Sequence, residues 1–316
     1  MLTRLGPEEL HRGEGQGEPG GYAHPSYVQT LAEFGAPIHL PSADAWLLRR
    51  PIPGCADVDA IGAYPFFACA DYARLREDLS GSTDLVSVGV VPDPFSCGDV
   101  ALLRAAFHHV VPFKTQYLAD LETGFDRYLS RHHRRDARRG LANFAIECAS
   151  EPAVHAGEWA DLYQDLVVRR ALSGLRAFSR ASLAGQLAVP GCRYFRALRD
   201  GTVHGVAVCY IDRGVAYLHL TSSTVLGRKL SAQYALIWSA IEHCRSVARW
   251  FVLGSVPGLS EEENTGLSFF KAGWATATCQ GYFCGHVTNA HRYEALCARR
   301  GGTGPAFPAY RADPLA

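Results

Sequence analysis

The second half of the chain has a regular pattern of apolar and polar residues that predicts one helix followed by three strands. Between residues 157 and 174 the apolar positions recur at helical spacing and form a single stripe, made of Trp159, Leu162, Tyr163, Leu166 and Val167. Three apolar runs follow at 192–199, 203–212 and 215–223, separated by the turn residues Asp200-Gly201 and Asp212-Arg213-Gly214. Turns this short join neighbouring antiparallel strands, so we expect an antiparallel meander.

Helices and strands also alternate in the rest of the chain. After the meander, the pattern predicts a helix at 231–247, a buried strand at 249–254, a helical turn at 265–274 and a last strand at 275–285. In the first half it predicts helices at 24–35, 69–80 and 124–139, and strands at 46–50, 84–91, 111–121 and 143–150. Residues 1–21 are rich in Gly and Glu and have no periodicity, so we expect a mobile leader there. The predicted fold class is α/β.

Length and composition limit the number of domains, the kinds of partner and the cellular location. A chain of 316 residues is long for one core and sufficient for two domains. Lys plus Arg and Asp plus Glu each total 31, so net charge favours neither nucleic acid nor an anionic membrane, and any polyanion has to be met by a local patch. We find neither a secretory signal nor an apolar run of about 18 residues, and we expect a cytoplasmic monomer without a membrane span.

The ten cysteines are scattered, mostly within apolar segments, which is typical of buried small side chains in a reducing compartment. The one grouping with ligand-like spacing is Cys279, Cys284 and His286. It lies on a single predicted strand with no second ligand pair, so we expect no metal site.

The segment TGLSFFKAGW, residues 265–274, is the strongest candidate for chemistry. It places Lys271 directly after Phe269 and Phe270 and before Gly273 and Trp274. An amine held among rings is poorly hydrated and can offer its charge where negative charge develops during a reaction. The alternative is that the three aromatic residues belong to the core while Lys271 extends to water.

The order of elements in the second half, and several of its segments, resemble the FemABX family of two tandem GNAT-like domains. The segments are YFRALRDGTVHGVAVCYI, VAYLHLTSS, SAQYALIWSAIEHC, WFVLGS and FFK followed by Gly273; in the first half they are VVPDPF and YLSRHHRRDARRGLANFAIE. The resemblance implies an N-terminal GNAT-like domain at 1–148, against which 295–316 is a candidate to pack, and a C-terminal one at 149–316. It also implies that an aminoacyl group moves from aminoacyl-tRNA to the amine of a small peptide, a cell-wall precursor or an antibiotic intermediate. Lys271 then takes the place of the lysine used at the transfer step, with Phe270 beside it.

Other residues are candidates for the cleft between the two domains. Asp93 could accept the proton of the attacking amine, although Asp before Pro is also a common turn former. Arg169 and Arg170 could hold an acceptor phosphate or simply complement a helix dipole. The side chains of Tyr217, His219 and Tyr234 could line an acceptor groove or belong to an aromatic core.

The helix RHHRRDARRG is a candidate phosphate-binding surface. Its five arginines are Arg131, Arg134, Arg135, Arg138 and Arg139, and helical spacing places most of them on one face. They could contact the phosphates of a tRNA or of a nucleoside diphosphate, or form a solvated face without a partner.

Two further functions remain open. An N-acyltransferase could use acyl-CoA or an acyl carrier, but the loop SSTVLGRKLSAQ has the single glycine Gly227 where CoA-binding loops have several. A binding module without activity could also use the cleft. The sequence has neither a nucleotide-binding G-x-x-x-x-G-K-[ST] nor a G-x-S-x-G nucleophile motif, and an activated ester needs no protein nucleophile. We expect no cofactor.

Overall fold

The computed structural model describes residues 2–10, 18–256, 265–300 and 307–311, and these are organised around one large mixed sheet. Within the described residues the strand order is β2-β3-β4-β5-β12-β6-β11-β10-β9-β8-β7, and β1 also pairs with β12. The strands are β1 (Thr3–Leu5), β2 (Ala36–Leu40), β3 (Ala45–Pro51), β4 (Val58–Gly62), β5 (Leu85–Val90), β6 (His109–Asp120), β7 (Ala145–Ala149), β8 (Cys192–Arg199), β9 (Thr202–Asp212), β10 (Val215–Ser223), β11 (Trp250–Gly254) and β12 (Ala277–Val287).

The predicted meander is confirmed, because β8 pairs antiparallel with β9 and β9 pairs antiparallel with β10. Both connecting turns contain residues with positive φ: 50° and 75° at Asp200 and Gly201, and 42° and 78° at Arg213 and Gly214. Glycine adopts this left-handed conformation readily, which explains why one stands in each turn.

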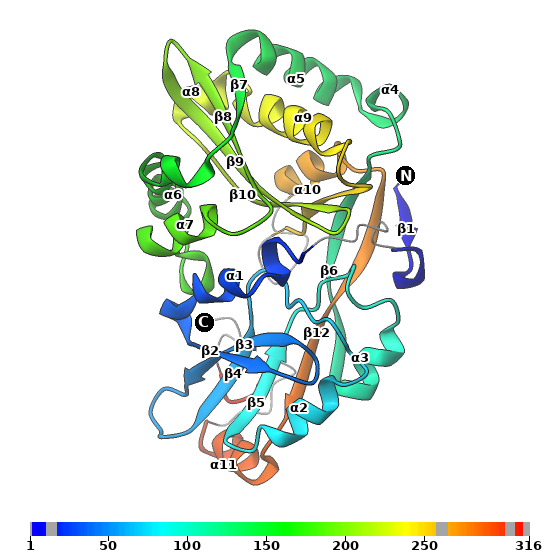
Figure 1. Ribbon diagram of the computed structural model, residues 1–316, viewed down its shortest axis with the longest axis vertical. Coiled ribbons are helices and arrows are strands. Elements are labelled where there is room, and N and C mark those ends of the chain that lie inside the picture. Colours follow the sequence, from blue (N-terminus) through cyan, green and yellow to red (C-terminus); the bar gives the residue numbers. More distant parts are fainter. Residues whose placement is uncertain (1, 11–17, 257–264, 301–306, 312–316) are drawn as a thin grey trace.

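Strands β6 and β12 connect the two halves of the chain (Figure 1). β6 pairs antiparallel with β11 of the second half and with β12, while β12 continues on to pair antiparallel with β5 of the first half. β7 spans the predicted boundary and pairs with β8 of the second half. The halves therefore share one sheet, and the division at 148/149 stays a prediction.

Helices cover both faces of the second half of the sheet. The helices of the described residues are α1 (Pro25–Gln29), α2 (Leu75–Gly81), α3 (Val100–Ala106), α4 (Phe125–Tyr128), α5 (Arg131–Asn143), α6 (Ala156–Arg170), α7 (Arg180–Leu187), α8 (Val225–Lys229), α9 (Ala232–Cys244), α10 (Thr265–Ala272) and α11 (Ala290–Arg300), of which α2, α3 and α11 pack on the first half of the chain. α9 and α5 pack on one face around Leu236 and Ile237, and α6 and α7 pack on the other around Trp159 and Leu183 (Figure 1). No helix in the described part of the chain is both long and apolar enough to cross a membrane.

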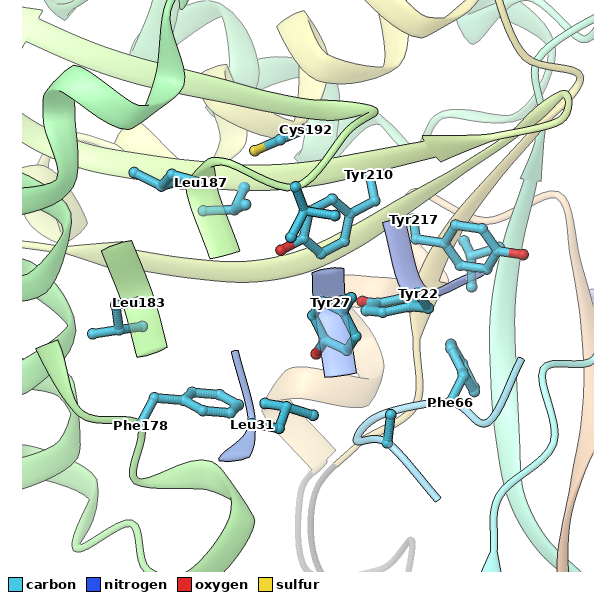
Figure 2. Packing of buried hydrophobic residues seen from close by; sticks show 14 of the residues in the cluster. Tyr22, Tyr27, Leu31, Phe66, Phe178, Leu183, Leu187, Cys192, Tyr210 and Tyr217 are labelled. Atoms are coloured by element: carbon cyan, nitrogen blue, oxygen red, sulfur yellow. The ribbon is translucent and has the colours of Figure 1, made fainter. Parts of the chain in front are cut away.

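The N-terminal residues belong to this architecture, which corrects our expectation of a mobile leader. Thr3–Leu5 pair in parallel with Ala277–Cys279 at the start of β12, and Leu10 is buried. Residues 11–17 lie outside the described residues. Tyr22 lies in the aromatic core between the halves, close to Tyr27, Tyr210 and Tyr217 (Figure 2). A three-residue strand is too short to show a period of two, so the pattern could not reveal it.

The C-terminal residues pack on the first half. The hydroxyl group of Tyr310 lies 2.7 Å from Oγ of Ser87 and donates to Oδ2 of Asp59 at 3.0 Å. The guanidinium group of Arg311 donates to both carboxylate oxygens of Asp59, at 2.6 and 2.9 Å. Residues 307–311 are thereby fixed to β4 and β5.

Candidate functional site

Lys271 is held at the end of β11 by two backbone carbonyl groups. Its Nζ donates to the carbonyl oxygen of Leu253 at 2.7 Å and to that of Ser255 at 2.6 Å. In an extended strand the carbonyl oxygens of alternate residues lie about 6.6 Å apart, too far for one nitrogen to reach both at these distances. Gly254, between them, has a φ of 75°, and this left-handed conformation curls the backbone around the amine.

The environment of Lys271 favours its neutral form. Burial, followed by the charge of nearby Lys114, lowers its pKa from 10.5 to about 7. Both protonation states are therefore populated near neutral pH. Because the carbonyl groups occupy two of the three hydrogen positions on Nζ, one position is left for a group in the adjoining cavity.

That cavity has a volume of about 980 Å³ and is lined by both halves of the chain. Its wall includes Lys271 and Phe270 from α10, Lys114 from β6, Gly254 from β11, and residues of β4, β5, β10, β12 and the end of α6. The volume is at the upper end of the range for small-molecule sites. Among the described lining residues there are four Lys or Arg side chains, those of Lys114, Arg170, Arg176 and Lys271, and no Asp or Glu.

Tyr217 and His219, two of the candidates for an acceptor groove, both line this cavity. A bulge in β10 between Leu218 and Leu220 lies at His219. Nδ1 of His219 lies 3.0 Å from the hydroxyl oxygen of Tyr22, and its Nε2 lies 3.1 Å from Oε1 of Gln186. Burial lowers the pKa of His219 to about 3, so the ring is neutral, with Nε2 donating to the amide oxygen and Nδ1 accepting from the tyrosine.

Asp93 lies behind this wall rather than on it. Its carboxylate accepts from the hydroxyl group of Tyr217 at 2.8 Å and from the backbone N–H of Phe95 at 3.1 Å. The second contact is that of an Asp turn former, the alternative that the sequence left open. Asp93 lines a separate cavity of about 20 Å³ and is absent from the described lining of the large one. The geometry assigns it the positioning of Tyr217, and its role as a base stays a prediction.

Of the remaining acceptor-site candidates, one is a described lining residue of the cavity and two are not. Arg170 lines the cavity, whereas Arg169 is not among its described lining residues. Tyr234 lies behind the cavity wall, with its ring centroid 4.9 Å from that of Phe270 and 6.0 Å from that of Trp274. It supports Phe270 from α9.

None of the arginines of α5 is among the described lining residues of the cavity. Arg131, Arg135, Arg138 and Arg139 are exposed, as the helical spacing predicts. Arg134 is directed back toward α4 instead, where it donates to the backbone carbonyl of Phe125 at 3.2 Å. It therefore leaves the predicted stripe, because α4 ends before α5 begins and exposes carbonyl groups at that turn.

His133, a residue that the sequence analysis overlooked, joins α5 to α10. It is fully buried, with Nε2 2.9 Å from the carbonyl oxygen of Phe270 and Nδ1 3.0 Å from Oγ of Ser130. A Cβ atom at Gly273 would lie 1.9 Å from this ring, so the glycine makes room for it. Burial lowers the pKa of His133, which keeps a neutral ring behind the lysine-bearing helix.

Comparisons with known proteins agree with this architecture. Residues 118–254 match the family model of an acetyltransferase (GNAT) domain. A search of curated proteins finds no significant match. The chain is similar in structure to FemX, with a TM-score of 0.62 at 12% identity, covering 93% of this chain and 99% of that one.

Two further solved structures are also similar. One is the C-terminal domain (DUF2156) of a protein from Agrobacterium fabrum designated a lysylphosphatidylglycerol synthetase, with a TM-score of 0.59 at 15% identity and coverage of 86% and 89% of the two chains. The other is L-PGS from Bacillus licheniformis, with a TM-score of 0.54 at 12% identity and coverage of 89% and 97%. The chain thus has the α/β fold of FemX and contains a GNAT domain, which confirms the resemblance and the fold class predicted from the sequence.

Proposed function

We propose that this protein is an aminoacyltransferase that forms an amide bond between an aminoacyl group and a small amine or peptide. The observation that carries the proposal is the Nζ of Lys271, fixed by two carbonyl groups with its remaining position available to a cavity of about 980 Å³. The fold shared with FemX and with proteins named lysylphosphatidylglycerol synthetase supports transfer of an aminoacyl group. Cell-wall precursors and antibiotic intermediates are acceptors of this class.

Lys271 carries the proton that the reaction moves from the attacking nitrogen to the leaving oxygen. The neutral amine of the acceptor attacks the ester carbonyl carbon, and the carbonyl oxygen becomes an oxyanion. As the C–O bond breaks, the ammonium form of Lys271 gives a proton to the leaving oxygen. The neutral lysine then takes the surplus proton from the new amide nitrogen, so one proton passes from nitrogen to oxygen in each turnover. A pKa of about 7 suits this exchange, since a proton carrier is most effective when its pKa lies near the working pH.

The donor in this proposal is aminoacyl-tRNA rather than acyl-CoA. In CoA-dependent enzymes of this fold a helix N-terminus offers free backbone amides to the pyrophosphate group. At the corresponding helix here, α8, the N–H of Gly227 already donates to Oγ1 of Thr224 at 3.0 Å. A Cβ atom at Gly227 would lie 2.0 Å from the carbonyl oxygen of His204, so this glycine provides close packing against β9 rather than an open loop.

Transfer assays test the proposal directly. Labelled aminoacyl-tRNAs are supplied with a panel of amines, and we expect an amide product that ribonuclease treatment abolishes. Lys271→Met is expected to lower the rate by about 10²–10³, the usual loss for one donor at a developing oxyanion. The matched control is Lys229→Met on the exposed side of α8, which is expected to leave the rate unchanged.

Other outcomes would replace the proposal. Activity on acyl-CoA that survives ribonuclease would make the protein an N-acyltransferase. A protein that binds amines or peptides without turnover, and whose affinity is the same in Lys271→Met, would be a binding module.

A further inference from the structure

Phe269 presents a large aromatic surface to solvent on the helix that carries Lys271. Its side chain is 58% exposed, and it is the aromatic member of the exposed large hydrophobic side chains in the described part of the chain. Residues 269 and 271 of a helix point in nearly opposite directions, so Phe269 lies on the face of α10 away from the cavity. A single exposed ring is common on protein surfaces, so its neighbours decide what it can bind.

The neighbours of Phe269 come from the basic helix α5. Its ring centroid lies 5.5 Å from that of His132 and 5.5 Å from that of His133. Nη2 of Arg135 lies 3.0 Å from Nδ1 of His132, so the guanidinium group is next to this ring pair. We call Phe269, His132 and Arg135, together with the exposed Arg131, the Phe269 surface.

The charge of the Phe269 surface is predominantly positive. The one acidic side chain in contact with it is that of Asp136, whose carboxylate lies 3.3 Å from Nε2 of His132 and 3.0 Å from Nε of Arg135, among the described residues. The side chain of Arg135 remains 69% exposed despite this pair. Arg138 and Arg139 extend the positive face along α5.

We propose that the Phe269 surface binds the unpaired 3′ end of an RNA acyl donor, with a base stacked on Phe269 and phosphate groups beside the exposed arginines of α5. This inference rests on the proposed function and identifies how its donor is held. Flat aromatic rings next to arginines are the usual means of binding single-stranded nucleic acid, because every base offers a face for stacking. A positive face with one carboxylate complements a phosphate backbone.

The distance across α10 fits a short stretch of RNA. A helix with its side chains is about 10–12 Å wide, and stacked nucleotides advance by about 3.4 Å along one strand. An ester bond at Lys271 and a base on Phe269 are therefore separated by a few nucleotides of one 3′ end. The hydrogen-bond contact between His133 and the carbonyl oxygen of Phe270 fixes α5 and α10 relative to one another, so the surface and the lysine keep a constant spacing.

RNA binding by the full-length protein tests the inference. The probes are a synthetic RNA stem with a four-nucleotide unpaired 3′ tail and the same stem with a blunt end, measured by fluorescence anisotropy. Phe269→Ala is expected to weaken binding of the tailed stem by about 5- to 150-fold, the equivalent of one base stack, and to leave the weaker binding of the blunt stem unchanged. Phe269→Tyr retains a ring and is expected to bind like the wild type. Val154→Ala is the control, because Val154 is a comparably exposed side chain, at 67%, that lies on the segment 152–155 rather than on α5 or α10.

Salt dependence separates stacking from charge. Phe269→Ala removes no cation and should leave the slope of affinity against salt unchanged, whereas Arg135→Gln with Arg138→Gln should flatten it. If the wild type binds both stems equally and Phe269→Ala has no effect, the surface assignment is wrong while an RNA donor stands. If the wild type binds neither stem, both this inference and the RNA donor of the proposed function are wrong.

Discussion

Replacing Lys271 by methionine is expected to change how the stability of the protein depends on pH. In the folded protein, burial and Lys114 lower the pKa of Lys271 to about 7, against 10.5 when it is unperturbed. Between these two values the unfolded chain holds a proton on Lys271 that the folded chain has largely released. Raising the pH therefore favours the folded state, and the wild-type protein gains stability from about pH 7 up to 10.5 and loses it again as the pH falls.

The magnitude follows from the size of the shift. One pKa unit corresponds to about 1.4 kcal/mol, so the free energy of unfolding of the wild type should rise relative to Lys271→Met by about 2 kcal/mol between pH 7 and pH 9. The methionine side chain also leaves the carbonyl groups of Leu253 and Ser255 without this donor. That loss is the same at every pH, so it shifts the difference between the two proteins without changing its slope.

Urea denaturation of both proteins at pH 6, 7, 8 and 9 measures the effect. The difference in unfolding free energy should be nearly constant below pH 6.5 and should climb by more than 1 kcal/mol per unit above pH 8. Lys229→Met, on an exposed helix outside the cavity, is the control and should show a constant difference from the wild type. A flat difference for Lys271→Met would mean that Lys271 keeps its full charge in the folded protein, and the proton exchange that we assign to it would lose its basis.

Three further substitutions test the surroundings of this lysine. Gly254→Ala places a non-glycine residue at a φ of 75° with its Cβ 3.4 Å from Nζ of Lys271, and circular dichroism melting should show that the free energy of unfolding falls by about 1–2 kcal/mol. In the control Gly157→Ala the new Cβ has no atom within 4 Å, so the free energy of unfolding should stay the same or rise. Lys114→Met removes a neighbouring positive charge and should raise the pKa of Lys271. Because the ammonium form starts the proposed proton exchange, kcat/KM should fall as the pH rises above about 7 in the wild type and at a higher pH in Lys114→Met; identical profiles would exclude this coupling. Tyr217→Phe removes a donor to the buried carboxylate of Asp93 and should cost about 1.5–3 kcal/mol in urea denaturation; a loss of activity at unchanged stability would instead favour a direct role for this hydroxyl group.

Local periodicity was sufficient to predict the elements around the site. The meander, its two short turns and the helix predicted at 157–174 are set by spacing within about ten residues, and the structure has them at nearly the predicted positions, with α6 as that helix. α7, between α6 and the meander, was not predicted. The exposed arginines of α5 follow from the same helical spacing. Arg134 does not, because its direction depends on where α4 ends, a boundary of one or two residues that periodicity does not resolve.

The parts of the site that the sequence did not reveal depend on long-range contacts or on backbone conformation. Lys114 comes close to Lys271 only because β6 pairs with β11 and β12. His133 reaches the carbonyl oxygen of Phe270 across 137 positions of the chain. Gly254 stands at the end of a predicted strand, where glycine is common. Only its φ angle shows that it directs the carbonyl groups of Leu253 and Ser255 toward Lys271.

The shared sheet has a consequence for how the cavity can work. Lys271 is anchored to β11, which pairs with β6, and β6 pairs in turn with β12, whose Phe283 also lines the cavity. Moving the two halves apart would break the ladder of backbone hydrogen bonds along β6 and β12, and these strands are among the longest in the described part of the chain. A hinge between the halves is therefore costly, and the wall that carries Lys271 keeps its geometry whether or not substrate is present. A proton carrier must lie within hydrogen-bond reach of the reacting atoms, so the substrates have to be brought to a lysine on a wall of fixed geometry. The contacts that orient donor and acceptor therefore have to come from side chains and local segments around the cavity, rather than from closure of one half upon the other.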